Sequence, residues 1–166
     1  MKHDCSSPIG LAISHDGRMY VCTEGMGGSA LCVREMNGSE SLLTLRSGPY
    51  QEYTEDLCCV QVQLCSDDAI VVNEEFDESN SLTKHCKDGE FIWEIKFETE
   101  LSIALDSSDL LYCATSDQVK VYLPSGAFSH VLVSDLNDPT AIAIDGDGNI
   151  HVGLVAENES MKKMSQ

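Results

Sequence analysis

Basic side chains are scarce in this sequence of 166 residues. Ten Lys or Arg stand against 28 Asp or Glu, which gives a formal net charge of −18. Binding to nucleic acid depends on cationic side chains that neutralise phosphates, and adhesion to an anionic membrane depends on them as well. The charge therefore argues against nucleic acids and membrane surfaces as partners.

Long apolar runs and helical patterns are missing too. No run approaches the roughly 18–20 apolar residues that span a bilayer, and the first ten residues, MKHDCSSPIG, hold no apolar core of a signal peptide. No stretch shows the 3.6-residue period and the caps of a helix. Because 42% of the residues are hydrophobic, we expect a packed protein built from strands.

Eight cysteines are present, but no two of them form a C-x-x-C pair. Zinc sites need such spacing, so we predict neither a metal site nor a cofactor. Several cysteines lie in apolar runs, such as LCV at 31–33 and LYCA at 111–114, where cysteine acts as a small buried hydrophobe. Because disulfides are rare where thiols are kept reduced, we expect reduced cysteines in a cytoplasmic protein.

The sequence repeats one pattern: a short apolar run, a polar turn and a second apolar run. The copies are 8–21, 59–72, 100–113 and 139–152. Their alignment places Asp16, Asp67, Ser108 and Asp147 at one turn position. A third run that ends in a polar-Gly turn, followed by a fourth run, continues each of the first three copies. Each full repeat thus predicts four short strands.

Four antiparallel strands in about 40–45 residues are typical of a β-propeller blade. A β-sandwich built from hairpins also explains the strands, but it does not explain the recurring Pro-x-x-apolar-Ala-Ile register. We therefore predict an all-β fold, a small or incomplete propeller of four-stranded antiparallel blades over residues 1–166. The expected blades are 8–48, 57–98, 100–135 and 138–166.

The repeats resemble NHL repeats, the blades of NHL-type propellers. That pattern runs Pro-x-Gly-apolar-Ala-apolar-Asp, then an Asp-Gly turn and Ile-Tyr-Val, and it ends in Val-x-Val-Phe/Tyr-x-Pro-x-Gly. The region 57–98 departs most, since it lacks the Pro and the Asp-Gly turn. YWTD-type and gluconolactonase-like propellers share much of this pattern. The matching residues are Pro8, Gly10, Leu11, Ala12, Ile13, Asp16, Gly17, Tyr20 and Val21 in the first copy, Val119, Val121, Tyr122, Pro124 and Gly126 in the third, and Pro139, Ala143, Ile144, Asp145, Asp147, Gly148, Asn149, Ile150 and Val152 in the fourth.

The resemblance implies six blades, whereas this chain holds three and part of a fourth. Only ENESMKKMSQ follows the hairpin at 140–155. A propeller must close or leave exposed sheet edges. Three explanations stay open: a fragment of a larger protein, which we favour, a small four-bladed ring, or a homodimer that completes the ring.

The resemblance also implies two classes of function. NHL-type propellers often serve as non-enzymatic binding modules, for example in TRIM-NHL ubiquitin ligases. The alternative is a metal-dependent propeller enzyme, either a gluconolactonase-like hydrolase or an amidating lyase. An enzyme needs groups that converge on one point, and the polar residues of the expected inner strands are too scattered, so we nominate no catalytic residue.

Acidic residues gather in the middle of the chain. Residues 51–100 contain 14 acidic and 3 basic side chains, and NEEFDESNS at 73–81 is expected to be a loop. Loops of this kind share one face of a propeller, the usual binding face, so we predict a protein partner that carries basic charge. The alternative is a solvated loop that keeps the protein soluble. The predicted binding residues are Glu24, Met26, Glu74, Glu75, Phe76, Asp77 and Asp117.

Two further features have ordinary structural interpretations. The segment from Asp145 to Asn149 resembles the start of a calcium loop, but Ile150 and Ala156 stand where the template needs Gly and Glu. We therefore interpret it as a hairpin turn. Trp93, the only tryptophan, alternates with charged neighbours in a strand-like run, which predicts packing against a neighbouring strand.

Overall fold

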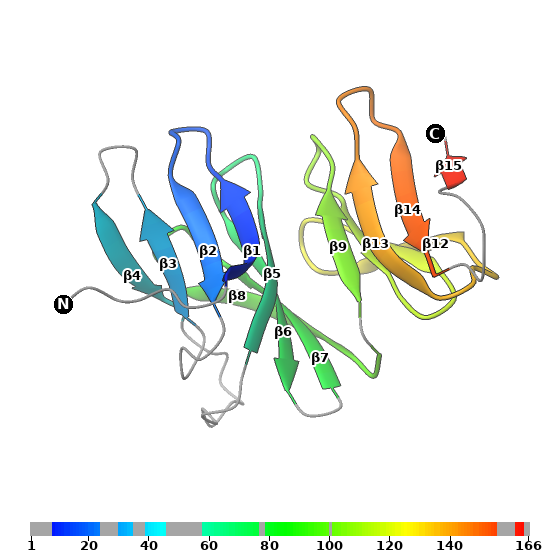
Figure 1. The fold of residues 1–166 in the computed structure, drawn as a ribbon, viewed down its shortest axis with the longest axis horizontal. Coiled ribbons are helices and arrows are strands. Elements are labelled where there is room, and N and C mark those ends of the chain that lie inside the picture. Colours follow the sequence, from blue (N-terminus) through cyan, green and yellow to red (C-terminus); the bar gives the residue numbers. More distant parts are fainter. Residues whose placement is uncertain are drawn as a thin grey trace. The chain divides into compact units, whose positions relative to one another are not determined.

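The computed structural model describes residues 8–23, 30–34, 39–45, 58–76, 79–99, 101–155 and 162–164. All the regular elements in this part are β-strands (Figure 1), and it holds no helix long and apolar enough to cross a membrane. The chain divides into two compact units, Met1–Lys96 and Phe97–Gln166. We call them unit 1 and unit 2 and describe each by itself.

Unit 1 contains two four-stranded sheets whose strands follow one another in sequence order (Figure 1). Sheet 1 consists of β1 (Pro8–Ile13), β2 (Met19–Thr23), β3 (Ala30–Arg34) and β4 (Glu40–Thr44). Sheet 2 consists of β5 (Cys58–Leu64), β6 (Ile70–Phe76), β7 (Ser79–His85) and β8 (Phe91–Phe97). These up-and-down sheets confirm the predicted four-stranded architecture.

Unit 2 repeats the same architecture. Sheet 3 consists of β9 (Ser102–Leu105), β10 (Leu111–Ala114), β11 (Val119–Tyr122) and β12 (Phe128–Val133). Sheet 4 has three described strands, β13 (Pro139–Ile144), β14 (Ile150–Leu154) and β15 (Lys162–Met164). The described strands of both sheets pair antiparallel.

The turn between the first two strands has the same geometry in every sheet. In the first sheet the amide of Gly17 donates to the carbonyl of Ser14 (3.0 Å), and the amide of Ser14 donates to the carbonyl of Arg18 (2.9 Å). Gly17 has φ +82°, as expected for a three-residue hairpin loop that ends in a left-handed residue. The equivalent left-handed residues in the other sheets are Asp68, Asp109 and Gly148. Each follows the turn position that the sequence alignment had superposed, so the structure confirms the register of the repeat.

The core of each unit lies between its two sheets. In unit 1, Tyr20 and Val33 of sheet 1 pack with Val62, Ile70 and Val72 of sheet 2. In unit 2, buried side chains of sheet 3 pack with buried side chains of sheet 4. They are Ala104, Tyr112, Ala114, Val119 and Val121 from sheet 3 and Ile142, Ile150 and Val152 from sheet 4. Each unit is therefore a pair of stacked sheets.

The cysteines only partly follow the expectation of reduced thiols. Cys65 and Cys113 are buried and free, and Cys86 is half-buried and free. Burial raises the pKa of the Cys113 thiol above its usual range, and the nearby Lys120 offsets this in part. The expectation is wrong for Cys22, which is disulfide-bonded. A buried strand position suits a thiol and a disulfide equally, because pairing depends on which cysteines of other strands face it.

Candidate functional site

Two loops of unit 2 are tied together at the edge where β11 and β13 begin. The β10–β11 loop is held by the Thr115 amide, which donates to the carbonyl of Gln118 (2.9 Å). The amide of Leu136, in the β12–β13 connection, donates to the carbonyl of Asp117 (2.8 Å). Loops that run separately along the sequence therefore form one surface.

The second of these loops has an unusual backbone. Asp135 and Asp138 adopt φ values of +58° and +48°, a region that Asp and Asn enter more readily than most residues. The carbonyl of Asp138 accepts from the Val155 amide (3.0 Å), which ties the residue to the end of β14. These contacts fix Asp138 directly before the first residue of β13.

A cavity of about 420 Å³ opens beside these loops. Its volume lies within the range of roughly 300–1,000 Å³ typical of small-ligand pockets. Three of its lining residues carry hydroxyl groups, one carries a carboxylate and two are apolar. The lining residues are Thr99, Leu101, Ser116, Asp138, Pro139 and Thr140. The hydroxyl groups can donate or accept hydrogen bonds, and the carboxylate of Asp138 can accept them.

Negative charge surrounds this cavity. Unit 2 contains eleven Asp or Glu and three Lys. Asp138 lines the cavity, Asp117 follows the lining residue Ser116, and Glu98 precedes Thr99. All three acidic residues are exposed. The surface therefore favours a cationic group that can also donate hydrogen bonds.

Of the predicted binding residues, the structure places Asp117 beside this cavity. Glu24, Met26 and Asp77 lie outside the described residues. The loop predicted at 73–81 is wrong at 73–76 and at 79–81, because β6 continues to Phe76 and β7 begins at Ser79. Residues 77–78 lie outside the described residues. Glu74 is only 2% exposed, so it is not a surface contact. Charged residues at an expected strand end suggested a loop, but the pairing of β6 with β7 extends through them.

Glu74 instead begins a buried chain of polar groups in unit 1. The Thr83 hydroxyl donates to Glu74 Oε2 (3.1 Å), and His85 Nε2 lies 3.0 Å from the same hydroxyl oxygen. His85 Nδ1 lies 3.3 Å from the carbonyl oxygen of Gly89. Burial lowers the pKa of His85, and the Gly89 carbonyl opposes this by favouring the charged ring. This chain is enclosed in the sheet stack, so we assign it to stability.

The carboxylates of the turns also have a structural role. Asp145 Oδ1 accepts from the amides of Asp147 (3.0 Å) and Asn149 (2.8 Å), and Oδ2 lies 3.0 Å from His151 Nε2. The hydrogen bonds from His151 and Asn149 hold the pKa of Asp145 well below its usual range. These contacts support the interpretation of this segment as a hairpin turn.

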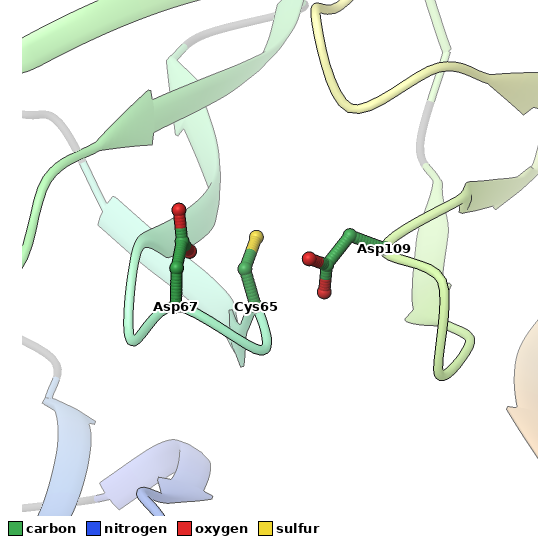
Figure 2. A group of neighbouring side chains, drawn as sticks. All are labelled: Cys65, Asp67 and Asp109. Carbon is green, nitrogen blue, oxygen red and sulfur yellow. The ribbon is translucent and has the colours of Figure 1, made fainter.

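The equivalent turns of the other sheets use the same device. Figure 2 shows Cys65 and Asp67 in the β5–β6 turn of unit 1, and Asp109 in the β9–β10 turn of unit 2. Asp67 Oδ1 accepts from the Ala69 amide (3.0 Å). Asp106 Oδ1 accepts from the Leu110 amide (2.9 Å), and its Oδ2 accepts from the Tyr112 hydroxyl (3.2 Å). Carboxylates at these positions are therefore explained by the turns themselves.

None of the six lining residues was predicted from the sequence, although the predicted Asp117 is the neighbour of one of them, Ser116. Asn137-Asp138-Pro139 is a turn signal and marks a loop, but it says nothing of a cavity. Thr99 and Ser116 lie at one end of the β9–β10 hairpin of sheet 3, in which Ser102 pairs with Ala114. Asp138, Pro139 and Thr140 come from the start of sheet 4. Their meeting depends on how sheets 3 and 4 stack, which composition and repeat pattern do not specify.

Comparisons with known proteins bear on the fold. No family model matches the sequence, and no curated protein matches it significantly. Solved structures do match: streptogramin B lyase (TM-score 0.65, 12% identity, 98% of this chain and 56% of that chain) and the PQQ-bound aldose sugar dehydrogenase from Streptomyces coelicolor (TM-score 0.65, 12% identity, 95% and 59%). The computationally designed Ika4 protein matches with a TM-score of 0.64 and 14% identity, over 98% of this chain and 92% of that chain.

These matches show the fold and not the activity, because every identity is far below 25%. The chain spans 56% and 59% of the two natural proteins. Its architecture is all-β, with four-stranded antiparallel sheets, and it is similar to six-bladed β-propellers over most of its length.

Proposed function

We propose that this chain is a non-enzymatic binding module of the NHL propeller type, and that the loop surface of unit 2 binds a basic segment of a protein partner. The single observation that carries the proposal is the 420 Å³ cavity, whose lining residues include Asp138 together with the hydroxyl-bearing Thr99, Ser116 and Thr140. The NHL assignment is supported by the repeat motifs and by their shared turn register.

The chemistry of the cavity suits a Lys or Arg side chain. The apolar stem of such a side chain can lie along Leu101 and Pro139, while its charged end donates to Asp138 and to the hydroxyl oxygens. The exposed Asp117 and Glu98 extend the negative surface. Neighbouring cationic residues of an extended peptide could pair with them, and such charges mainly raise the association rate.

The test measures the binding of two capped peptides, hexa-arginine and hexa-glutamine, to the full chain by calorimetry at about 0.1 M NaCl, where the Debye length is about 10 Å. We expect hexa-arginine to bind and hexa-glutamine not to bind. The substitution Asp138→Asn keeps the shape of the side chain, and Asn tolerates the positive φ of this residue. A hydrogen bond to a charged group contributes about 1.5–3 kcal/mol, so this variant should bind hexa-arginine at least about tenfold more weakly.

The matched control is Asp147→Asn. Asp147 is an exposed residue of the turn between β13 and β14, so it lies beyond the end of β13 opposite to Asp138. It removes the same charge from the same unit, and we expect a change in affinity of about twofold or less, since long-range effects are screened by salt. Equal weakening by both substitutions would reduce the interaction to non-specific attraction and contradict the proposal, as would the absence of binding.

A further inference from the structure

Three large apolar side chains on β1 are exposed to solvent. Ile9, Leu11 and Ile13 are 44%, 59% and 61% exposed, and their alternation places them on one face of the strand. Met19 and Val21, which pair with Ile13 and Leu11, share that face. The other face of β1 is covered, because Ala12 packs against the core of unit 1. Exposed apolar stripes of this kind mark interaction surfaces.

The repeat shows what normally covers this face. The positions of Leu11 and Ile13 correspond to Val62 and Leu64 in sheet 2 and to Ile142 and Ile144 in sheet 4. Val62 packs against Tyr20 and Val33 of sheet 1, the sheet that precedes it. Ile142 packs in the same way with Ala104 and Tyr112 of sheet 3. The exposed face of sheet 1 is thus the face that a preceding sheet covers elsewhere.

The face of a sheet that covers the next sheet has a pattern of its own. Its first strand carries a small residue and, two positions later, Ala, and its second strand carries Tyr. Gly10 is the small residue in sheet 1, and a Cβ atom there would lie 3.1 Å from the Cα atom of Gln61. Ser102 takes this position in sheet 3, where its hydroxyl oxygen accepts from the Ile142 amide of the next sheet (3.3 Å). Small residues therefore let the inner strand of the next sheet come close.

Sheet 4 carries this covering pattern on a face that is also uncovered. Ala141 takes the position of Gly10 and Ser102, Ala143 takes that of Ala12, and both are exposed. His151 takes the position of Tyr112, and it makes the equivalent contact to the turn carboxylate, Asp145. The chain thus presents one complementary face on sheet 1 and another on sheet 4.

We propose that the β1 face of one copy is covered by the β13–β14 face of a second copy, so that two chains associate head to tail. Each of the two contacts would repeat the packing seen inside both units. Two copies supply eight sheets of this kind, within the four to eight blades of closed propellers, whereas three copies would exceed that range. A single copy holds four such sheets, so closure within one chain is the outcome that a monomeric mass would reveal. Closure through two identical contacts gives a dimer and not an open filament.

The negative net charge of each copy opposes this association, and the resulting salt dependence distinguishes it from a contact built from ion pairs. Each copy carries a net charge of −18, and like charges at this density repel over about one Debye length, roughly 10 Å at 0.1 M salt. The β1 face itself is apolar, and Ala141 and Ala143 form the apolar part of the β13–β14 face. The dimer should therefore become tighter as salt increases, while a contact built from ion pairs would become weaker.

The test measures the mass of the full chain by light scattering at low and high concentration, and at low salt and about 0.5 M NaCl. We expect the wild-type chain to have twice the monomer mass of 18.1 kDa at high concentration. Leu11→Glu and Ala141→Arg should each raise the dissociation constant on the order of 100-fold or more, because each places a charge in an apolar contact. Both side chains are exposed in the single copy, so circular dichroism should be unchanged.

Two controls separate this contact from other associations. Ile92→Glu replaces another exposed apolar side chain of unit 1, 49% exposed on β8, and should leave the dimer intact. A mixture of the Leu11→Glu and Ala141→Arg chains should form dimers again, because one of the two contacts then joins two unaltered faces. A monomeric wild-type chain, an open series of oligomers, a dimer weakened by salt, or no recovery in the mixture would each overturn the proposal.

Discussion

A buried chain of polar groups in unit 1 consists of Glu74, Thr83 and His85. The protonation state of His85 in this chain affects the stability of the protein. The Thr83 hydroxyl carries one proton, which it donates to Glu74, while His85 Nε2 lies beside the same oxygen. His85 is 1% exposed, and burial disfavours the charged imidazolium. The state of this one residue therefore links stability to pH.

We predict that the protein loses stability as the pH falls below about 6.5, the usual pKa of His. The folded-state pKa of His85 is lowered, so below this pH the unfolded chain takes up a proton that the folded chain does not. The free energy of unfolding then falls by up to about 1.4 kcal/mol per pH unit, until the pH reaches the folded-state pKa. Urea denaturation between pH 5 and pH 8 would measure this slope.

The variant His85→Gln should remove most of that slope, although it should also cost stability at pH 8. His130→Gln is the control, since His130 is exposed on β12. An increase of wild-type stability on acidification would contradict the prediction. If His85→Gln abolished that increase, Glu74 would hold His85 in its charged form through Thr83. An increase shared by both chains would come from relief of the repulsion among the acidic groups.

At the scale of the element, two kinds of residue, Gly and Asp, occupy the left-handed position of the repeated hairpin turn. Gly17 and Gly148 occupy it with φ values of +82°, and Asp68 and Asp109 with +61°. A residue with a Cβ atom costs about 1–2 kcal/mol in this region, less when it is Asp or Asn. The turns of sheets 2 and 3 are therefore more strained than those of sheets 1 and 4.

We predict that Gly148→Ala lowers the free energy of unfolding by about 1 kcal/mol. No atom lies within 4 Å of a Cβ placed on Gly148, so the cost comes from the positive φ and not from a clash. Gly146→Ala is the matched control, because its Cβ also enters open space and its φ is not in the left-handed region. Chemical denaturation should show little change or a slight gain for Gly146→Ala, and equal losses for the two variants would contradict this account.

At the scale of the whole molecule, local patterns predicted much of the fold. The repeat pattern of the sequence superposes one turn position in each copy, and the residue after this position is left-handed in the structure. These turn positions are Asp16, Asp67, Ser108 and Asp147. Periodicity and turn chemistry act over a few residues, so one sequence suffices to read them. The cavity around Asp138 depends on how sheets 3 and 4 meet, and no local pattern encodes this contact.

The charge balance of the molecule leads to the last prediction. A net charge of −18 destabilises the compact state through self-repulsion, and salt screens this repulsion. Raising NaCl from low concentration to about 0.5 M should therefore increase the free energy of unfolding by roughly 1–2 kcal/mol, which corresponds to a few screened surface charge pairs. Urea denaturation of the Leu11→Glu chain would measure this without a contribution from association.

Near pH 4, where many carboxyl groups are protonated, the same increase in salt should have a much smaller effect. A salt effect of equal size at both pH values would point to general salting-out of apolar surface, since that mechanism does not depend on the charge of the protein.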